Sequence, residues 1–255
     1  MTAPTTSAVG FGIDIGGSGI KGAPVDLATG ELIGERLRIP TPQPSKPRAV
    51  AATVAELVAA FDIPATTPVG LTFPAPIKHG VVPFIANLDE SWQGVDVPEL
   101  MSDATGREVI GVNDADAAGI AEVAFGAAKD VPGVVLVTTL GTGIGSALVV
   151  DGTLVPNTEL GHLEIDGHDA EDRAASSVKE AEDLSWEEWA GRLQRFYDTV
   201  EMLFSPDLLV VGGGVSKKHE KFLPLLRTKA PIVPAGLRNT AGIVGAAHLA
   251  AHGYR

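Results

Sequence analysis

Three glycine-rich segments of the chain have the composition of phosphate-binding turns. DIGGSGIK begins at Asp14, directly after an apolar run, TLGTGIGS begins at Thr139, and VVGGGVS begins at Val210. Glycine leaves backbone N–H groups accessible to an anion. Each segment alone could equally be a plain turn, and none is a Walker or Rossmann motif. The candidate phosphate or nucleotide contacts are Asp14, Gly16, Gly17, Ser18, Gly19, Lys21, Thr139, Gly141, Thr142, Gly143, Gly212, Gly213 and Gly214.

A carboxylate that could act as a general base follows the apolar segment VIGV. NDADAAG places Asp114 at the end of a predicted strand and at the start of a predicted helix. A carboxylate in that position could accept the proton of a sugar hydroxyl during phosphoryl transfer. The local pattern leaves open that Asp114 or Asp116 only caps the helix.

A second polar cluster, ELGHLE, contains Glu159, His162 and Glu164 within six residues. Histidine and glutamate together can bind a metal or the hydroxyl groups of a sugar, although a lone histidine is more often structural. The chain has no cysteine, which excludes disulfides and makes a structural zinc site an unfavoured interpretation.

The overall charge limits the possible partners. The formal net charge of −13 disfavours nucleic acid as a partner. Against this background Lys217, Lys218 and Lys221 follow the third glycine segment closely, so they could be a track for a polyanion. They could equally lie on an ordinary exposed helix face.

The elements that must position these residues can be predicted from apolar runs and turn residues. We expect strands at 9–15, 22–25, 33–39, 69–73, 109–112, 134–139, 144–150, 153–155 and 208–211. We expect one helix capped by Ser45 with Pro47 in its first turn, and another beginning at Ser185. The uncharged stretch 131–150 contains several glycines, which favours two buried strands over a membrane span.

The two halves of the chain repeat one another. A shift of 125 positions places Gly16 on Gly141, Val25 on Val150 and Asp26 on Asp151, each within a strand, glycine turn and strand. Two such units predict two α/β domains whose glycine turns are opposed across a cleft, which suits a phosphate chain.

Taken in order, DIGGSGIKG, NDADAAG, LGTGIGS, NTELGHLE and GGGVS resemble the ROK family of sugar kinases over nearly the whole chain. Within that family, TPQPSKP, NLDESW, EDRAASSVKE and NTAGIVGAA are similar to the actinobacterial polyphosphate glucokinases and glucomannokinases. The resemblance implies a duplicated actin-like, ribonuclease H-like α/β fold. Its expected domains are 1–112, completed by the C-terminal helix 241–255, and 113–240.

The same resemblance implies roles for individual residues. Asp114 would be the catalytic base and Asp14 a ligand of Mg²⁺, directly or through water. The sugar hydroxyls would be held by Asn87, Asn113, Asp114, Glu159, His162 and Glu171. The zinc-binding cysteines that usually precede the segment matched by EDRAAS are missing, so His162 would bind sugar and no zinc.

The expected reaction is phosphorylation of the 6-hydroxyl of glucose by polyphosphate or ATP, with mannose as a further candidate acceptor. A strictly ATP-dependent kinase for another hexose remains the alternative. The N-terminus shows no secretory signal, so we expect a cytoplasmic enzyme without a membrane or nucleic-acid partner, and the resemblance implies a homodimer.

Overall fold

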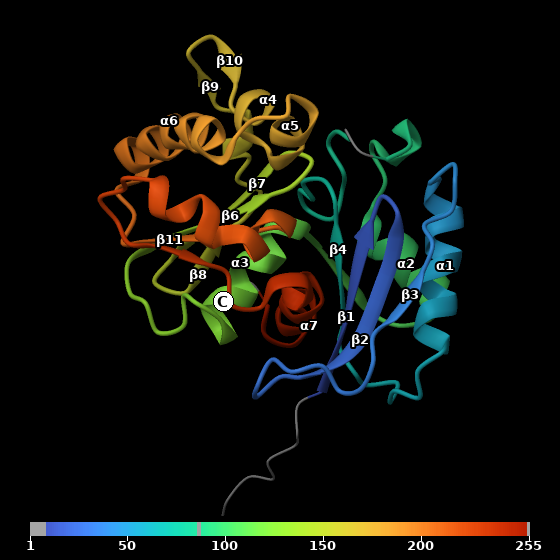
Figure 1. Cartoon of the computed structure of the whole chain (residues 1–255). Helices are drawn as coiled ribbons and strands as arrows, with labels where there is room; N and C mark the ends of the chain where they lie inside the picture. Colours follow the sequence, from blue (N-terminus) through green and yellow to red (C-terminus); the bar gives the residue numbers. More distant parts are fainter. Residues whose placement is uncertain (1–8, 86–87, 254–255) are drawn as a thin grey trace, which may run out of the picture. The chain divides into compact units, whose positions relative to one another are not determined.

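The computed structural model describes residues 9–85 and 88–253, and these form two compact units. Of the described residues, the first unit contains 9–85, 88–117 and 242–253, and the second contains 118–241. Each unit has one five-stranded sheet (Figure 1). The predicted domain boundaries, between residues 112 and 113 and between 240 and 241, stay a prediction.

The sheet of the first unit has the order β3-β2-β1-β4-β5. The chain makes an antiparallel meander through β1 to β3 and then adds β4 and β5 parallel to β1. Phe11, Ile13 and Ile15 alternate along β1 and are buried in one hydrophobic core with α1 and α2. The bounds are β1 Val9–Gly16, β2 Gly19–Asp26, β3 Leu37–Ile39, β4 Val69–Phe73, β5 Val109–Asn113, α1 Pro47–Ala59, η1 Glu90–Trp92 and α2 Val97–Thr105.

Helix α7, Ala241–His252, covers the other face of this sheet at very short range. A Cβ atom on Gly12 of β1 would lie 1.8 Å from the carbonyl oxygen of Ile243, and one on Gly70 of β4 would lie 2.0 Å from that of Ala246. Glycine at both positions therefore lets the helix backbone approach the strands. The C-terminal segment thus packs on the first strand of the chain.

The sheet of the second unit repeats this plan, with the order β12-β11-β6-β7-β8. Its meander is β6 to β8, and β11 and β12 run parallel to β6. The same connectivity in both sheets confirms the predicted fold class, a duplicated α/β fold. The strands are β6 Val134–Leu140, β7 Ile144–Val150, β8 Thr153–Val155, β11 Leu208–Gly212 and β12 Ile232–Pro234.

The two faces of the second sheet are covered by different helices. On one face, Gly119 of α3 lies against Ala147 of β7. On the other, Trp189, Leu193 and Phe196 of α6 pack into the core that contains β6 and β11. The remaining elements are α3 Asp114–Phe125, η2 Leu160–His162, β9 Glu164–Ile165, β10 His168–Asp169, α4 Glu171–Ala174, α5 Ser176–Ala181, α6 Trp186–Phe204, η3 Gly214–Lys221, η4 Leu223–Leu225 and η5 Arg238–Thr240.

Most predicted elements are confirmed within one to three residues, and two details are wrong. The third strand covers only Leu37–Ile39 instead of 33–39. Ser45 does not cap the first helix, whose N-cap is Lys46 without a side-chain bond. The Ser45 carbonyl instead accepts the indole N–H of Trp92 at 2.7 Å, because that fully buried side chain needs a partner. The predicted cap at Ser185 is confirmed as a capping box with Glu188.

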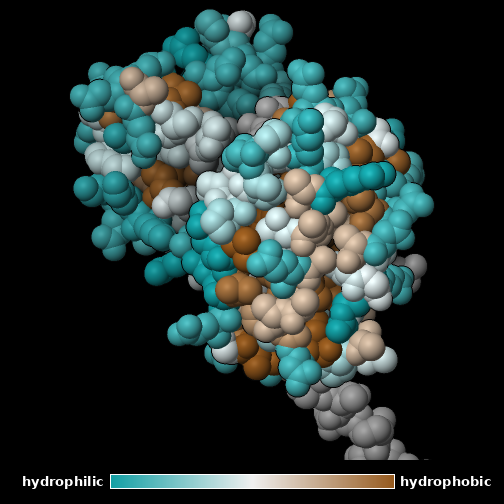
Figure 2. Space-filling view, turned by 90° about the vertical axis from the view of Figure 1, so that its right-hand side faces the viewer, coloured by the Kyte–Doolittle hydropathy of each residue, from teal (hydrophilic) through white to brown (hydrophobic). Residues whose placement is uncertain are grey.

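One face of the first unit exposes many small apolar side chains. Helix α1 carries exposed alanines at positions 52 and 59, and its C-cap, Ala60, is exposed as well. Figure 2 shows apolar residues gathered among hydrophilic ones on this side. Buried apolar residues of α1 point the opposite way, into the core.

Candidate active site

Asp14 lies at the carboxyl end of β1, where two neighbouring strands supply partners for it. The antiparallel register pairs it with Lys21, whose Nζ donates to Oδ2 at 2.8 Å. The parallel register pairs it with Thr72, whose Oγ1 donates to Oδ1 at 3.1 Å. The carboxylate also lies beside Gly242 in the first turn of α7, where the helix dipole favours a negative charge. The carboxylate is therefore held in one orientation.

The first glycine turn is tied down through its carbonyl oxygens. Arg38 donates to the carbonyl of Ser18 at 2.8 Å, Thr41 donates to that of Gly16, and Gln43 donates to that of Gly17 at 3.3 Å. These acceptors would repel a phosphate, and here they are engaged by the chain itself. A Cβ on Gly17 would meet nothing within 4 Å, so the turn keeps open space beside its backbone. The three anchoring side chains were not predicted.

The candidate base lies at the same edge of the first sheet. β5 ends at Asn113 and α3 begins at Asp114. Asn113 caps this helix, since its Oδ1 accepts the N–H groups of Ala115 at 2.9 Å and Asp116 at 3.2 Å, and Asp114 Oδ1 also accepts the Ala115 N–H, at 2.8 Å. The Asp114 side chain is exposed, whereas Asp116 is 1% exposed. Asp114 is thus placed where a substrate can reach it, and the Asn113 amide keeps only its N–H donors for a ligand.

The second glycine turn has the same kind of support in the second unit. Ser176 Oγ and the Ser177 N–H both donate to the carbonyl of Gly141, at 3.0 and 3.1 Å. Ser177 Oγ donates to the carbonyl of Thr142 at 2.6 Å. Short helix α5 therefore engages the carbonyls of this turn, as the segment 38–43 does for the first. In both duplicated turns, side chains from another segment bond the turn carbonyls, and the sequences of the turns do not show this.

The third glycine turn adjoins the second. The parallel register places Gly212 opposite Thr139, and both lie at the carboxyl ends of their strands. Gly213 has a φ of 83°, and a Cβ there would lie 2.2 Å from the carbonyl oxygen of Leu140. Ser216 closes the turn by donating to the Gly213 carbonyl at 2.8 Å.

The predicted sugar residues of the second unit form one cluster. His162 Nδ1 lies 3.0 Å from Asp169 Oδ2 and 3.9 Å from Glu171 Oε1. Glu171 Oε2 accepts the N–H of Ile144 at 3.0 Å, which ties the cluster to the second glycine turn. Asp169, on the short hairpin β9–β10, was not predicted, because only the hairpin brings it back to His162.

The electrostatics of this cluster favour a protonated histidine. The hydrogen bond that His162 donates to Asp169, assisted by the charge of Glu171, raises the pKa of His162, although partial burial of the ring opposes this. Burial raises the pKa of Glu159, and the charge of Glu171 adds to that effect while His162 opposes it. With Nδ1 committed to Asp169, the Nε2 atom of His162 is left for a ligand, as a donor when the ring is protonated and as an acceptor when it is neutral.

The predicted lysine track lies on η3, where Lys217, Lys218 and Lys221 are exposed. The Nζ atoms of Lys218 and Lys221 lie 6.0 and 5.7 Å from the centre of the Trp186 ring. Lys179 lies on the same ring at 4.4 Å. Three cations therefore share one aromatic side chain. Asn87 falls outside the described residues.

The described ranges contain no group of three or more His, Cys, Asp or Glu side chains that could hold a metal ion. Mg²⁺ commonly uses only one or two carboxylates and takes its other ligands from substrate phosphates and water. Asp14, with its fixed carboxylate beside a glycine turn, fits that pattern. Asp14 would hold the ion directly or through water, with Lys21 keeping the carboxylate in place.

The chain belongs to the ROK family, whose family model matches residues 10–173. It is 52% identical over 244 residues to the polyphosphate glucokinase of Mycobacterium tuberculosis strain CDC 1551, covering 95% of this chain and 91% of that protein. The Mycobacterium leprae polyphosphate glucokinase is 51% identical over 248 residues, 96% of this chain and 76% of that one. Over the part of the chain that the structure describes, no helix has the length and apolar character needed to cross a membrane.

A solved structure is also similar to this chain over almost its whole length. It is the inorganic polyphosphate/ATP-glucomannokinase from Arthrobacter sp. strain KM, which is 56% identical, with a TM-score of 0.91. The match covers 96% of this chain and 98% of that chain. The family that the glycine and carboxylate motifs predicted is thereby confirmed.

Proposed function

We propose that this chain is a kinase that transfers a phosphoryl group from polyphosphate or ATP to the 6-hydroxyl of glucose. The observation that carries the proposal is its 52% identity, over 95% of its length, to a polyphosphate glucokinase. The similarity to a polyphosphate/ATP-glucomannokinase, at 56% identity, supports both donors and makes mannose the second acceptor to test.

In the proposed reaction the Asp114 carboxylate accepts the proton of the sugar 6-hydroxyl. The oxygen attacks the terminal phosphorus in line, and the bond from that phosphorus to the bridging oxygen of the donor breaks. ADP, or a polyphosphate one unit shorter, leaves. The exposed position of Asp114 at the start of α3 supports its role as the base.

The sugar would be held by the cluster of the second unit. Protonated His162 donates from Nε2 to a sugar hydroxyl, and Glu159 accepts from another. Asn113 adds a donor, because its Oδ1 is occupied by the helix N-terminus. Glu171 positions the cluster by joining His162 to the second glycine turn.

The donor phosphates would be bound by the three glycine turns. Their amide groups and the hydroxyl of Thr142 provide hydrogen bonds, while several turn carbonyls are engaged elsewhere. Mg²⁺, held by Asp14 directly or through water, would neutralise charge on the transferring group.

A long polyphosphate would continue along the lysine track. The net charge of −13 makes a local group of cations necessary for such a substrate. Lys218 and Lys221, with Lys179, are held near Trp186. We further propose a cytoplasmic homodimer, as the family resemblance implies.

The decisive experiment measures initial rates with glucose and mannose, each against ATP and polyphosphate. Asp114→Ala should abolish turnover with either donor and leave glucose binding, measured by calorimetry, mostly intact. Asp103→Ala removes an exposed carboxylate from α2 and should change neither. Substantial turnover by the Asp114 variant would reject it as the base, and activity restricted to ATP and another hexose would favour the alternative kinase.

The lysine track needs a separate test. The triple variant of Lys217, Lys218 and Lys221 to alanine should lose activity with polyphosphate and keep it with ATP. Equal losses with both donors, or none with either, would contradict the track.

A matched triple variant controls for the loss of charge. Arg48, Lys78 and Lys129 are exposed cations outside the turns and the track. Their replacement by alanine should leave both donor activities near wild type.

A further inference from the structure

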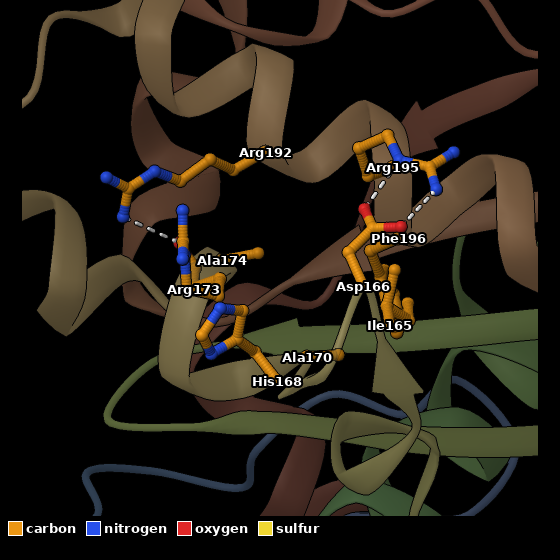
Figure 3. A pocket seen from close by; sticks show the side chains of 9 residues that line it. All are labelled: Ile165, Asp166, His168, Ala170, Arg173, Ala174, Arg192, Arg195 and Phe196. Carbon is orange, nitrogen blue, oxygen red and sulfur yellow. Dashed lines mark hydrogen bonds and ion pairs between the residues drawn. The ribbon is translucent and has the colours of Figure 1, made fainter.

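A cavity of about 220 Å³ lies in the second unit, between the β9–β10 hairpin, α4 and α6. Its floor is apolar, formed by Ile165, Ala170, Ala174 and Phe196. Its rim is cationic, and Figure 3 shows the side chains of His168, Arg173 and Arg192 on one side and the Arg195–Asp166 pair on the other. Three guanidinium groups line the cavity, and two carboxylates, Asp166 in its lining and Glu182 beside it, accept bonds from them.

The three arginines differ in how far they are neutralised. Arg195 makes two bonds to Asp166, at 3.0 and 2.8 Å. Arg192 bonds Glu182 at 2.6 Å and the carbonyl of Arg173 at 3.3 Å. The guanidinium groups of Arg195 and Arg192 are therefore held in place, and each is paired with a carboxylate.

Arg173 differs from these two, although its charge acts on Asp166 and Glu182 at longer range. Within residues 9–85 and 88–253, no carboxylate lies within the 4.0 Å of an ion pair to its guanidinium. Its side chain is exposed and points into the cavity beside His168. A guanidinium fork next to an imidazole is a donor set suited to a phosphate group, and the apolar floor suits the carbon face of a small ligand.

We propose that this cavity binds a small phosphomonoester dianion, with Arg173 and His168 contacting the phosphate and Arg192 adding charge. The segment EDRAAS contains Arg173, but no sequence pattern assigned that residue a role, and none of the cavity's lining residues belongs to a glycine turn. The residues that line the cavity are the whole argument for binding of a phosphate group. The choice of glucose 6-phosphate as a test ligand rests on the proposed function.

Binding of a dianion in the cavity should change the affinity of the sugar cluster for glucose. Arg173 lies on the same short helix, α4, as Glu171, and His168 directly precedes Asp169, which holds His162. A ligand that bonds Arg173 and His168 therefore contacts α4 and the β9–β10 hairpin, the two segments that orient the sugar cluster. We expect a bound dianion to change the KM for glucose more than kcat.

The binding test uses the full chain with saturating glucose and no phosphoryl donor, so that glucose occupies the sugar cluster. Calorimetric titration with glucose 6-phosphate should show saturable binding, which Arg173→Ala weakens at least about tenfold. Arg173→Lys should give an intermediate affinity, because it keeps the charge without the fork. Arg48→Ala, at an exposed arginine of α1, should bind like the wild type.

Absence of binding to the wild type, or equal binding by Arg173→Ala, would overturn the proposal. Unchanged melting temperatures show that the variants are folded. Titration with inorganic phosphate separates the ligand sources, since equal affinity indicates free phosphate and weaker affinity indicates an ester. These titrations need no turnover, so failure of the proposed kinase activity would leave their result interpretable.

The coupling is tested by kinetics. Added phosphate should shift the KM for glucose in the wild type and not in Arg173→Ala, whose kcat without added anion should be normal. An unchanged KM at saturating anion would overturn the coupling to the sugar cluster.

Discussion

One substitution, glycine to alanine inside a helix, should have opposite effects at two positions of this chain. Gly191 lies in α6 and is exposed, and a Cβ there would meet nothing within 4 Å. Gly245 lies in α7 and is buried, and a Cβ there would lie 1.8 Å from the carbonyl oxygen of Ala117. Helix propensity favours alanine at both sites by about 0.8–1 kcal/mol.

The magnitudes follow from these contacts. Gly191→Ala should stabilise the chain by about 1 kcal/mol and raise Tm by about 2–4 °C. At Gly245 an ordinary contact begins at 3.4 Å, so the backbones of α7 and α3 must separate by about 1.6 Å. Overpacking costs about 1–3 kcal/mol, and a backbone atom gives way less readily than a side chain. We expect a net loss of about 2 kcal/mol and a Tm lower by about 4–8 °C.

The assay is thermal unfolding followed by circular dichroism, with urea midpoints as a second measurement. Turnover gives a further readout, because Ala117 lies in the first turn of α3, which begins at Asp114. Gly245→Ala should lower kcat at a temperature where it remains folded, and Gly191→Ala should not. A Gly245 variant as stable as the wild type, or two variants that shift Tm in the same direction, would refute the argument.

Three further predictions concern buried and titrating groups. Glu122 is 1% exposed and accepts three backbone N–H groups, so Glu122→Ala should cost about 3 kcal/mol or more in a urea titration, and a cost below 1 kcal/mol would contradict this. Asp169→Asn should lower the pKa of His162, measured by NMR, because the hydrogen bond to Asp169 is the main cause of its rise. The stability that this pair contributes is present below about pH 6.5 and is lost above the raised pKa of His162. Burial, with the charge of His252, lowers the pKa of His248 to about 4, so unfolding should become easier as the pH falls from about 6.5 towards 4, and a His248→Gln variant should show a flatter profile in that range.

Local patterns were enough to predict most of the strands and the duplication. The strand bounds of β4, β7 and β8 follow directly from short apolar runs between turn residues. The uncharged stretch 131–150 resolves into β6 and β7, because its glycines interrupt it at the turn. These features depend on the alternation of neighbouring residues, which sequence displays directly.

The helix cap at α3 shows the limit of such patterns. The sequence offered Asp114 and Asp116 as caps. In the structure Asp114 Oδ1 accepts the N–H of Ala115 at 2.8 Å, and Asn113 Oδ1 accepts the same N–H and that of Asp116. All three residues are good caps, and only the end of β5 decides which of them meet the helix N–H groups. Sequence therefore identified the segment, and the backbone path brought Asn113 into the cap beside Asp114.

The identity of the glycine turns and of the main polar residues was available from the sequence, because their types and spacing are local. The partners that orient them were not. Arg38 on the first turn, Asp169 on His162 and Arg173 in the cavity reach their places through a strand, a hairpin and a short helix. Hydrogen bonds and ion pairs depend on distances of about 3 Å between atoms of segments that only the folded chain brings together.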